Sequence, residues 1–82
     1  MSNAAPLIEP AGWSALRALV RQRERLGFTR TDVAAAMGVD YTYVCALERG
    51  ASKVSDRFRR RYAAALETLV AAKTARIAEQ PR

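Results

Sequence analysis

Apolar residues recur every three or four positions between Trp13 and Leu26, at Leu16, Leu19 and Val20. This spacing predicts an α-helix with one apolar face. Gly27 follows directly, and glycine commonly ends a helix in the left-handed conformation. We therefore expect a first helix over 13–26. Residues 1–11 precede it, and two prolines among small and polar residues there favour a flexible arm.

One charged residue interrupts this apolar stripe. Arg23 lies one helical turn after Leu19 and Val20. Burying a guanidinium without a partner is costly, because the charge loses its hydration. The pattern therefore predicts that a group elsewhere in the chain pairs with Arg23.

Two short helices with clear boundary signals follow. Thr29 suits the N-cap of a second helix, and Asp32 places a negative charge near its positive end. Gly38 ends that helix. Asp40 can cap a third helix over 41–49, which Gly50 ends.

The connection between these two helices is only three residues long, at 38–40. A turn this short forces the two helices to cross steeply. The apolar side chains expected inside the resulting angle are Val33, Met37, Val39, Val44 and Leu47. One face of the third helix therefore enters the core, and the other is left outside.

The outer face of the third helix carries mostly small side chains. At about 100° per residue from Val44, the positions opposite the core are Thr42, Cys45, Ala46 and Arg49, with Tyr41 and Tyr43 beside them. A DNA major groove about 12 Å wide admits a helix, and small side chains permit close approach.

A longer periodic stretch completes the chain. Ser55 can cap a helix whose apolar positions are Phe58, Tyr62, Leu66, Leu69 and Val70. This helix either runs to about Glu79 or breaks near 63–65. The positions Leu66, Leu69, Val70, Lys73 and Ile77 form either a dimer seam or a face that packs back onto the domain. We expect three regions, namely an arm at 1–11, a domain at 12–72 and a helical extension and tail at 73–82.

The composition narrows the range of possible functions. The 82 residues fit one small domain, and 14 basic against 8 acidic residues give a net charge of +6. Such a surplus favours nucleic acid as a partner. A single cysteine and no histidine exclude an internal disulfide and argue against a metal site. We expect no cofactor, no small-molecule ligand and no membrane span, and the absence of a secretory signal at the start favours the cytoplasm.

Residues 29–50, TRTDVAAAMGVDYTYVCALERG, resemble the helix-turn-helix of Cro and lambda-repressor-like (XRE) regulators from phages and prokaryotes. The resemblance extends from about Leu16 to Leu69. Its most specific positions are Ala34, Gly38-Val39 and Glu48-Arg49-Gly50. It implies an all-α, compact bundle of four to five helices in which the second and third helices form the helix-turn-helix. It also implies a homodimer on double-stranded DNA, with half-sites about 34 Å apart.

The resemblance also assigns roles to residues. The base-reading positions fall on Tyr41, Thr42, Cys45 and Ala46. The positions that hold the DNA backbone fall on Arg30, Tyr43 and the loop at Ser52 and Lys53. Arg49 and Arg57 are further candidates for contact with the backbone. An arginine of the first helix pairs with the glutamate before Arg49 in this family, which matches Arg23 with Glu48. The chain departs from the family at Arg30, where glutamine is common, and at Asp40, where serine is common. Asp40 either accepts from a cytosine amino group or is held back by its cap.

Three functional hypotheses follow from these patterns. The first is a sequence-specific transcriptional regulator, acting as a repressor, with helix 41–49 in the major groove. The alternative is a protein-interaction module, such as an antitoxin-type partner, that retains the helix-turn-helix shape. An enzyme is disfavoured, because the sequence has no histidine, no glycine-rich phosphate loop and no paired carboxylates.

Two further features have alternative interpretations. Cys45 is either a residue that faces the groove or a redox sensor. The three arginines Arg59-Arg60-Arg61 are expected to form a solvated face.

Overall fold

The computed structural model describes residues 12–50 and 53–79, which form four helices and, within those ranges, no strand. The helices are α1 (Trp13–Leu26), α2 (Arg30–Met37), α3 (Tyr41–Glu48) and α4 (Asp56–Glu79). The all-α class predicted from the sequence is confirmed. The expected arm at 1–11 and the expected DNA contact at Ser52 lie outside the described residues.

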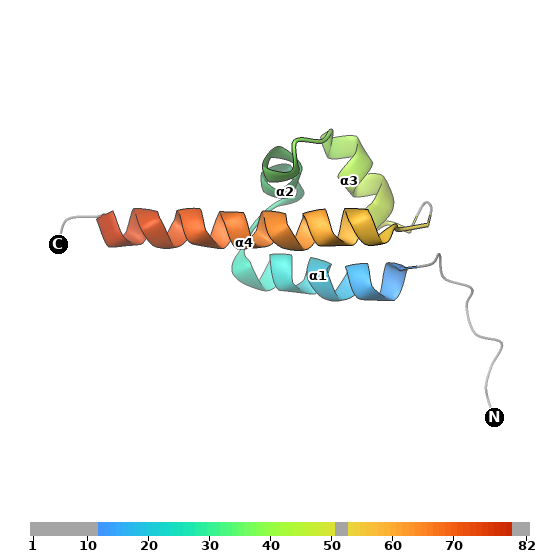
Figure 1. Ribbon diagram of the computed structural model, residues 1–82, viewed down its shortest axis with the longest axis horizontal. Helices are drawn as coiled ribbons and strands as arrows, with labels where there is room; N and C mark the ends of the chain where they lie inside the picture. Colours follow the sequence, from blue (N-terminus) through green and yellow to red (C-terminus); the bar gives the residue numbers. More distant parts are fainter. Residues whose placement is uncertain (1–11, 51–52, 80–82) are drawn as a thin grey trace, which may run out of the picture.

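Helix α4 is the central element of the fold (Figure 1). It packs against α2 on one side and α1 on the other, while α3 also contacts α1 and α2. The core between them consists of Leu16, Val33, Ala34, Met37, Val44, Leu47, Val54, Phe58, Tyr62, Ala65 and Leu66. The apolar stripes predicted for each helix therefore meet in one cluster, and Val39 closes the α2–α3 corner from its edge.

The predicted N-terminal caps of α2, α3 and α4 are present. The Thr29 hydroxyl accepts from the Asp32 backbone N–H at 3.0 Å, and the Asp32 carboxylate accepts from the Thr29 N–H at 2.8 Å. The Asp40 carboxylate accepts from the Thr42 N–H at 2.9 Å. Ser55 accepts from the Phe58 N–H at 3.0 Å. These bonds satisfy backbone donors that the first turn of a helix leaves free.

The α2–α3 corner is fixed at both sides of its turn. Gly38 has φ +71°, a left-handed conformation that residues with a Cβ rarely adopt. The Val39 N–H then donates to the Ala34 carbonyl at 3.0 Å. From α4, Arg61 Nη2 donates to the Met37 carbonyl at 2.7 Å and holds the end of α2 in place.

The end of α3 rests on the start of α1. Gly50 has φ +78°, and a Cβ added there would lie 3.1 Å from the Trp13 ring. Arg17 covers the ring with its guanidinium carbon 4.2 Å from a ring centroid. A side chain at position 50 would therefore disturb both the backbone and this contact.

Helix α4 is continuous, so the alternative of a break near 63–65 is wrong. It extends well past the other three helices (Figure 1), and every side chain from Ala71 to Glu79 is exposed. We call residues 71–79 the overhang. The expected seam is therefore divided, because Leu66 is buried in the chain's own core and Leu69 packs against it, whereas Ile77 is 62% exposed.

Within the described ranges, none of the helices combines the length and the apolar character needed to cross a membrane.

Candidate functional site

The outer face of α3 is open to solvent over most of its length. Thr42 and Arg49 are exposed, Ala46 is half-buried, and Tyr41 and Tyr43 are 47% and 49% exposed. The helix ends at Glu48, and Arg49 follows as its cap residue with helical backbone angles. A ridge of small side chains between two tyrosines therefore faces outward.

Cys45 does not belong to this outer face, and the expectation that it points outward is wrong. Its side chain is buried, with 8% of the residue exposed. The side chain of Arg30 lies against the thiol, close enough to contribute to the raised pKa of the guanidinium. A helical wheel of α3 alone does not show this cover, because it comes from α2.

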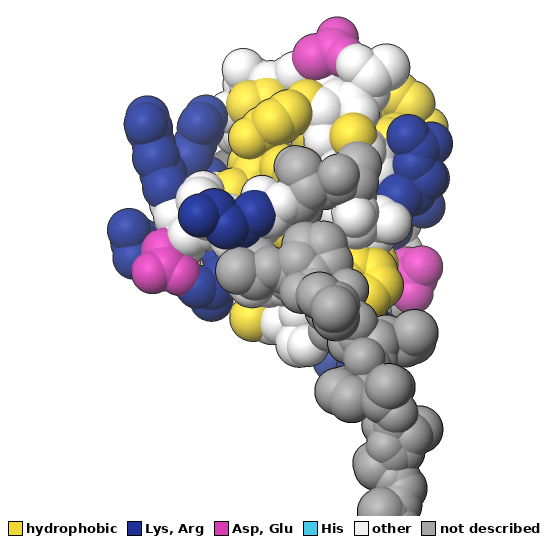
Figure 2. All heavy atoms as spheres, turned by 90° about the vertical axis from the view of Figure 1, so that its right-hand side faces the viewer, with side chains coloured by type: hydrophobic (Ala, Val, Ile, Leu, Met, Phe, Trp, Pro, Cys, Tyr) yellow, Lys and Arg dark blue, Asp and Glu magenta, His cyan; other side chains and the backbone are white. Residues whose placement is uncertain are grey.

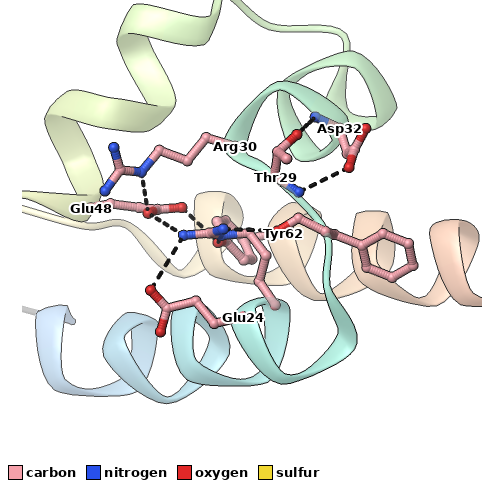
Figure 3. A network of polar contacts seen from close by, with 8 residues as sticks. Glu24, Thr29, Arg30, Asp32, Glu48 and Tyr62 are labelled. Atoms are coloured by element: carbon pink, nitrogen blue, oxygen red, sulfur yellow. Dashed lines mark hydrogen bonds and ion pairs between the residues drawn. The ribbon is translucent and has the colours of Figure 1, made fainter.

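A hydrogen-bonded cluster around Glu48 lies beneath one end of α3 (Figure 3). Glu48 Oε1 accepts from Arg23 Nη2 at 3.1 Å and from Arg30 Nε at 2.9 Å. Glu48 Oε2 accepts from the Tyr62 hydroxyl at 2.7 Å. That hydroxyl in turn accepts from Arg23 Nε at 3.0 Å, and Arg23 Nη1 donates to the Phe28 carbonyl at 2.9 Å. The partner that the sequence required for Arg23 is therefore Glu48, together with Tyr62.

The electrostatics of this cluster favour fixed charges. Burial lowers the pKa of Arg23, but Glu48 and Tyr62 outweigh that effect and leave the pKa above its ordinary value. The hydrogen bond to Glu48 raises the pKa of Arg30. Burial, followed by the nearby Glu48, raises the pKa of Tyr62 far above its ordinary value. Around Glu48, the cluster therefore holds two guanidinium cations and one neutral phenol at neutral pH.

Asp40 is turned toward its own helix. Its carboxylate accepts from both the hydroxyl and the backbone N–H of Thr42, and these two bonds lower the pKa of Asp40. The carboxylate therefore lies at the N-terminus of α3, where a negative charge interacts favourably with the helix dipole. This geometry matches the alternative in which the cap holds Asp40 back.

A second group of side chains lies where α3 meets the start of α4. The Tyr43 ring packs edge-on against Phe58, with ring centroids 5.5 Å apart. Tyr43, Ser55, Arg57 and Arg61 surround a small hollow beside this contact. Arg57 and Lys53 are exposed nearby in sequence. The structure therefore brings Tyr43 and Arg57 together beside one hollow.

Basic side chains flank the end of the molecule where α1 and α4 begin. Figure 2 shows Lys and Arg side chains at both edges of that face, with an Asp or Glu side chain beside them at each edge. The exposed basic residues of the third and fourth helices and their connection include Arg49, Lys53, Arg57, Arg60 and Arg61. The three consecutive arginines 59–61 do not share one environment, since Arg59 pairs with Asp56 and Arg61 with the end of α2.

Two members of the site were not found from the sequence. Tyr62 was predicted as a core residue only, and Arg30 only as a DNA-backbone contact without a protein partner. A tyrosine on an apolar stripe gives no sign of where its hydroxyl points, because that depends on the packing of α4 against α1. The departure from glutamine at Arg30 was the one available signal, since a guanidinium can bind a carboxylate and still keep free donors.

No family model, curated protein or solved structure matches this chain.

Proposed function

We propose that the protein is a sequence-specific regulator of transcription, a repressor, that binds double-stranded DNA. In this proposal α2 and α3 form a helix-turn-helix of the lambda-repressor type, and α3 enters the major groove. The observation that carries it is the outer face of α3, where Thr42 and Ala46 lie between exposed tyrosines on a short helix held by the core. Small side chains there allow the helix backbone to approach base edges.

The flanks of α3 supply the contacts that a DNA backbone requires. Arg30 lies on one side of the helix, and Tyr43 and Arg57 lie on the other, with Arg49 at its end and Lys53 exposed in the connection to α4. Backbone contacts fix the register of a protein on the duplex, and base contacts provide the specificity. We assign base reading to Tyr41, Thr42 and Ala46, without the buried Cys45.

The proposal includes a homodimer. A helical segment as short as the overhang is only marginally stable in water unless it packs against other residues. A second copy of the chain would cover the apolar side of the overhang at Ile77 and the exposed Val70 just before it. A two-fold dimer would then read half-sites about one DNA turn, or 34 Å, apart.

The test is selection of bound sequences from random duplexes, followed by mobility-shift titrations on the selected and scrambled sites. We expect the logarithm of affinity to fall linearly with the logarithm of salt concentration. The slope should be about −0.9 for each phosphate contacted. Arg30→Ala should weaken all duplexes alike, by about 10-fold, and reduce the salt slope by about one. Thr42→Ala should instead change the preference between duplexes.

Arg21→Ala provides the matched control, because it removes an exposed arginine on α1 outside the proposed contacts. It should leave the selected sequence unchanged. If the wild-type protein binds no duplex at low salt and is recovered in a defined protein complex, the interaction-module alternative replaces this proposal.

A further inference from the structure

The guanidinium of Arg30 is fixed at its Nε atom, and the Cys45 thiol lies beside it. Arg30 Nε donates to Glu48 Oε1 at 2.9 Å (Figure 3). Its Nη1 and Nη2 atoms form no hydrogen bond to an oxygen atom of residues 12–50 or 53–79, and the side chain is 42% exposed. Because the guanidinium is planar, holding the Nε edge also sets the direction of the remaining N–H donors.

The carboxylate that holds Arg30 is itself immobilised. The Glu48 side chain is 2% exposed, and its two oxygens accept from α1 through Arg23 and from α4 through Tyr62. Three helices therefore converge on one carboxylate. Arg30 is the first residue of α2, and its side chain, 42% exposed, is the one in this cluster of four that solvent reaches to a substantial extent.

The outer side of Arg30 borders a surface hollow of about 450 Å³. Thr29, Thr31 and Tyr41 also line it, so the hollow lies between the start of α2 and the start of α3. Glu24 shares the hollow, but its carboxylate lies 3.9 Å from Arg23. An anion that enters the hollow would therefore meet Arg30 beside the proposed reading face of α3.

We propose that Glu48 and Tyr62 are positioning residues that preset Arg30 as a two-pronged ligand for one backbone phosphate of a DNA duplex. This inference rests on the proposed DNA binding. A guanidinium can give its Nε edge to Glu48 and a pair of parallel N–H bonds to phosphate. Because the side chain is already fixed, little rotamer freedom is lost when the phosphate binds. A lysine ammonium has the same charge but no second edge.

The first experiment compares Lys and Ala substitutions at positions 30 and 57 in mobility shifts on the selected duplex. Arg57 is the matched reference, since it is exposed and forms no ion pair within the described ranges. Each Ala variant should lose about 10-fold in affinity. Lysine at 57 should recover most of that loss, because charge suffices there. Lysine at 30 should recover less than about a third of the affinity lost by Arg30→Ala, although its salt slope should equal that of the wild-type protein. Equal recovery at both positions would overturn the inference.

The second experiment is a double-mutant cycle of Glu48→Gln with Arg30→Ala, read as duplex affinity. If Glu48 acts through Arg30, the two changes are coupled by at least about 5-fold, a magnitude typical of directly interacting residues. The change in net charge at position 48 cancels in the cycle. Additive effects would contradict the positioning role.

The two proposals fail in different ways. If wild-type protein binds no duplex, DNA binding itself is wrong. If wild-type protein binds and the Lys–Ala comparison is the same at 30 and 57, only the positioning of Arg30 is wrong. Should Glu48→Gln not fold, the comparison of positions 30 and 57 still decides, since neither residue is buried.

Discussion

Arg23 and Glu48, 25 residues apart, form an ion pair at 3.1 Å with both side chains almost completely buried. The pair joins the last turns of α1 and α3. Every guanidinium nitrogen of Arg23 has a partner, because Nε meets the Tyr62 hydroxyl and Nη1 meets the Phe28 carbonyl. The buried cation therefore fixes how the first helix, the third helix and α4 meet.

Arg23→Ala should lower the free energy of unfolding by about 3–5 kcal/mol, since it removes the buried cation paired with Glu48 and the donor to the Phe28 carbonyl. Urea unfolding followed by circular dichroism measures this. Arg21→Ala, two positions earlier and exposed, should change stability by less than about 0.5 kcal/mol. A loss below about 1 kcal/mol for Arg23→Ala would show that the pair contributes little.

Tyr62 should make the protein sensitive to alkaline pH. The pKa of this phenol is raised in the folded state, so the folded protein keeps the proton that the unfolded chain releases above about pH 10. The contribution of Tyr62 to the free energy of unfolding is therefore fully present below about pH 10 and is lost as the pH rises beyond it. Tyr62→Phe should cost about 1–3 kcal/mol at neutral pH and flatten the alkaline decline. Urea unfolding between pH 8 and 11 tests this, and parallel declines for both proteins would contradict it.

The capping box at the start of α2 should contribute measurably to stability. Thr29→Ala removes the hydroxyl that accepts from the Asp32 N–H, at an expected cost of about 1 kcal/mol. Thr31→Ala, on an exposed position of the same helix, is the matched control and should be near neutral. Thermal unfolding of both variants measures the difference. Equal melting temperatures would mean that the cap has no net effect.

The overhang should control the oligomeric state. Ile77→Glu places a charge on its exposed apolar side and should convert a dimer into a 9.0 kDa monomer in sedimentation equilibrium. Ala75→Glu, on nearly the opposite side of α4 at about 100° per residue, should leave the dimer intact. A wild-type protein that sediments as a monomer at every concentration would remove the dimer from the proposal.

Much of the fold was predictable because its signals are local. Thr29, Asp40 and Ser55 satisfy backbone donors within three residues of themselves, so their roles can be read directly from the chain. The apolar stripes likewise predict which side of each helix is buried. Arg23 was informative for the same reason, since a charge on such a stripe demands a partner.

The remaining features depend on contacts between helices, which no single segment encodes. Cys45 is covered by a side chain of α2, so a wheel of α3 alone assigns it to the wrong side. The bond from Arg61 to the Met37 carbonyl depends on how α4 lies along α2. The direction of Arg30 depends on Glu48, whose own place is set by α1 and α4. Long polar side chains have several staggered rotamers, and tertiary packing selects among them.

The contact between Trp13 and Gly50 has a practical consequence. Trp13 is the sole tryptophan of the chain, and its ring lies against the residue that follows Arg49 at the end of α3. Its fluorescence is therefore an intrinsic, label-free optical reporter of events at that end of the helix. Emission spectra recorded while a ligand is added would follow occupancy of the α3 face in the unmodified protein.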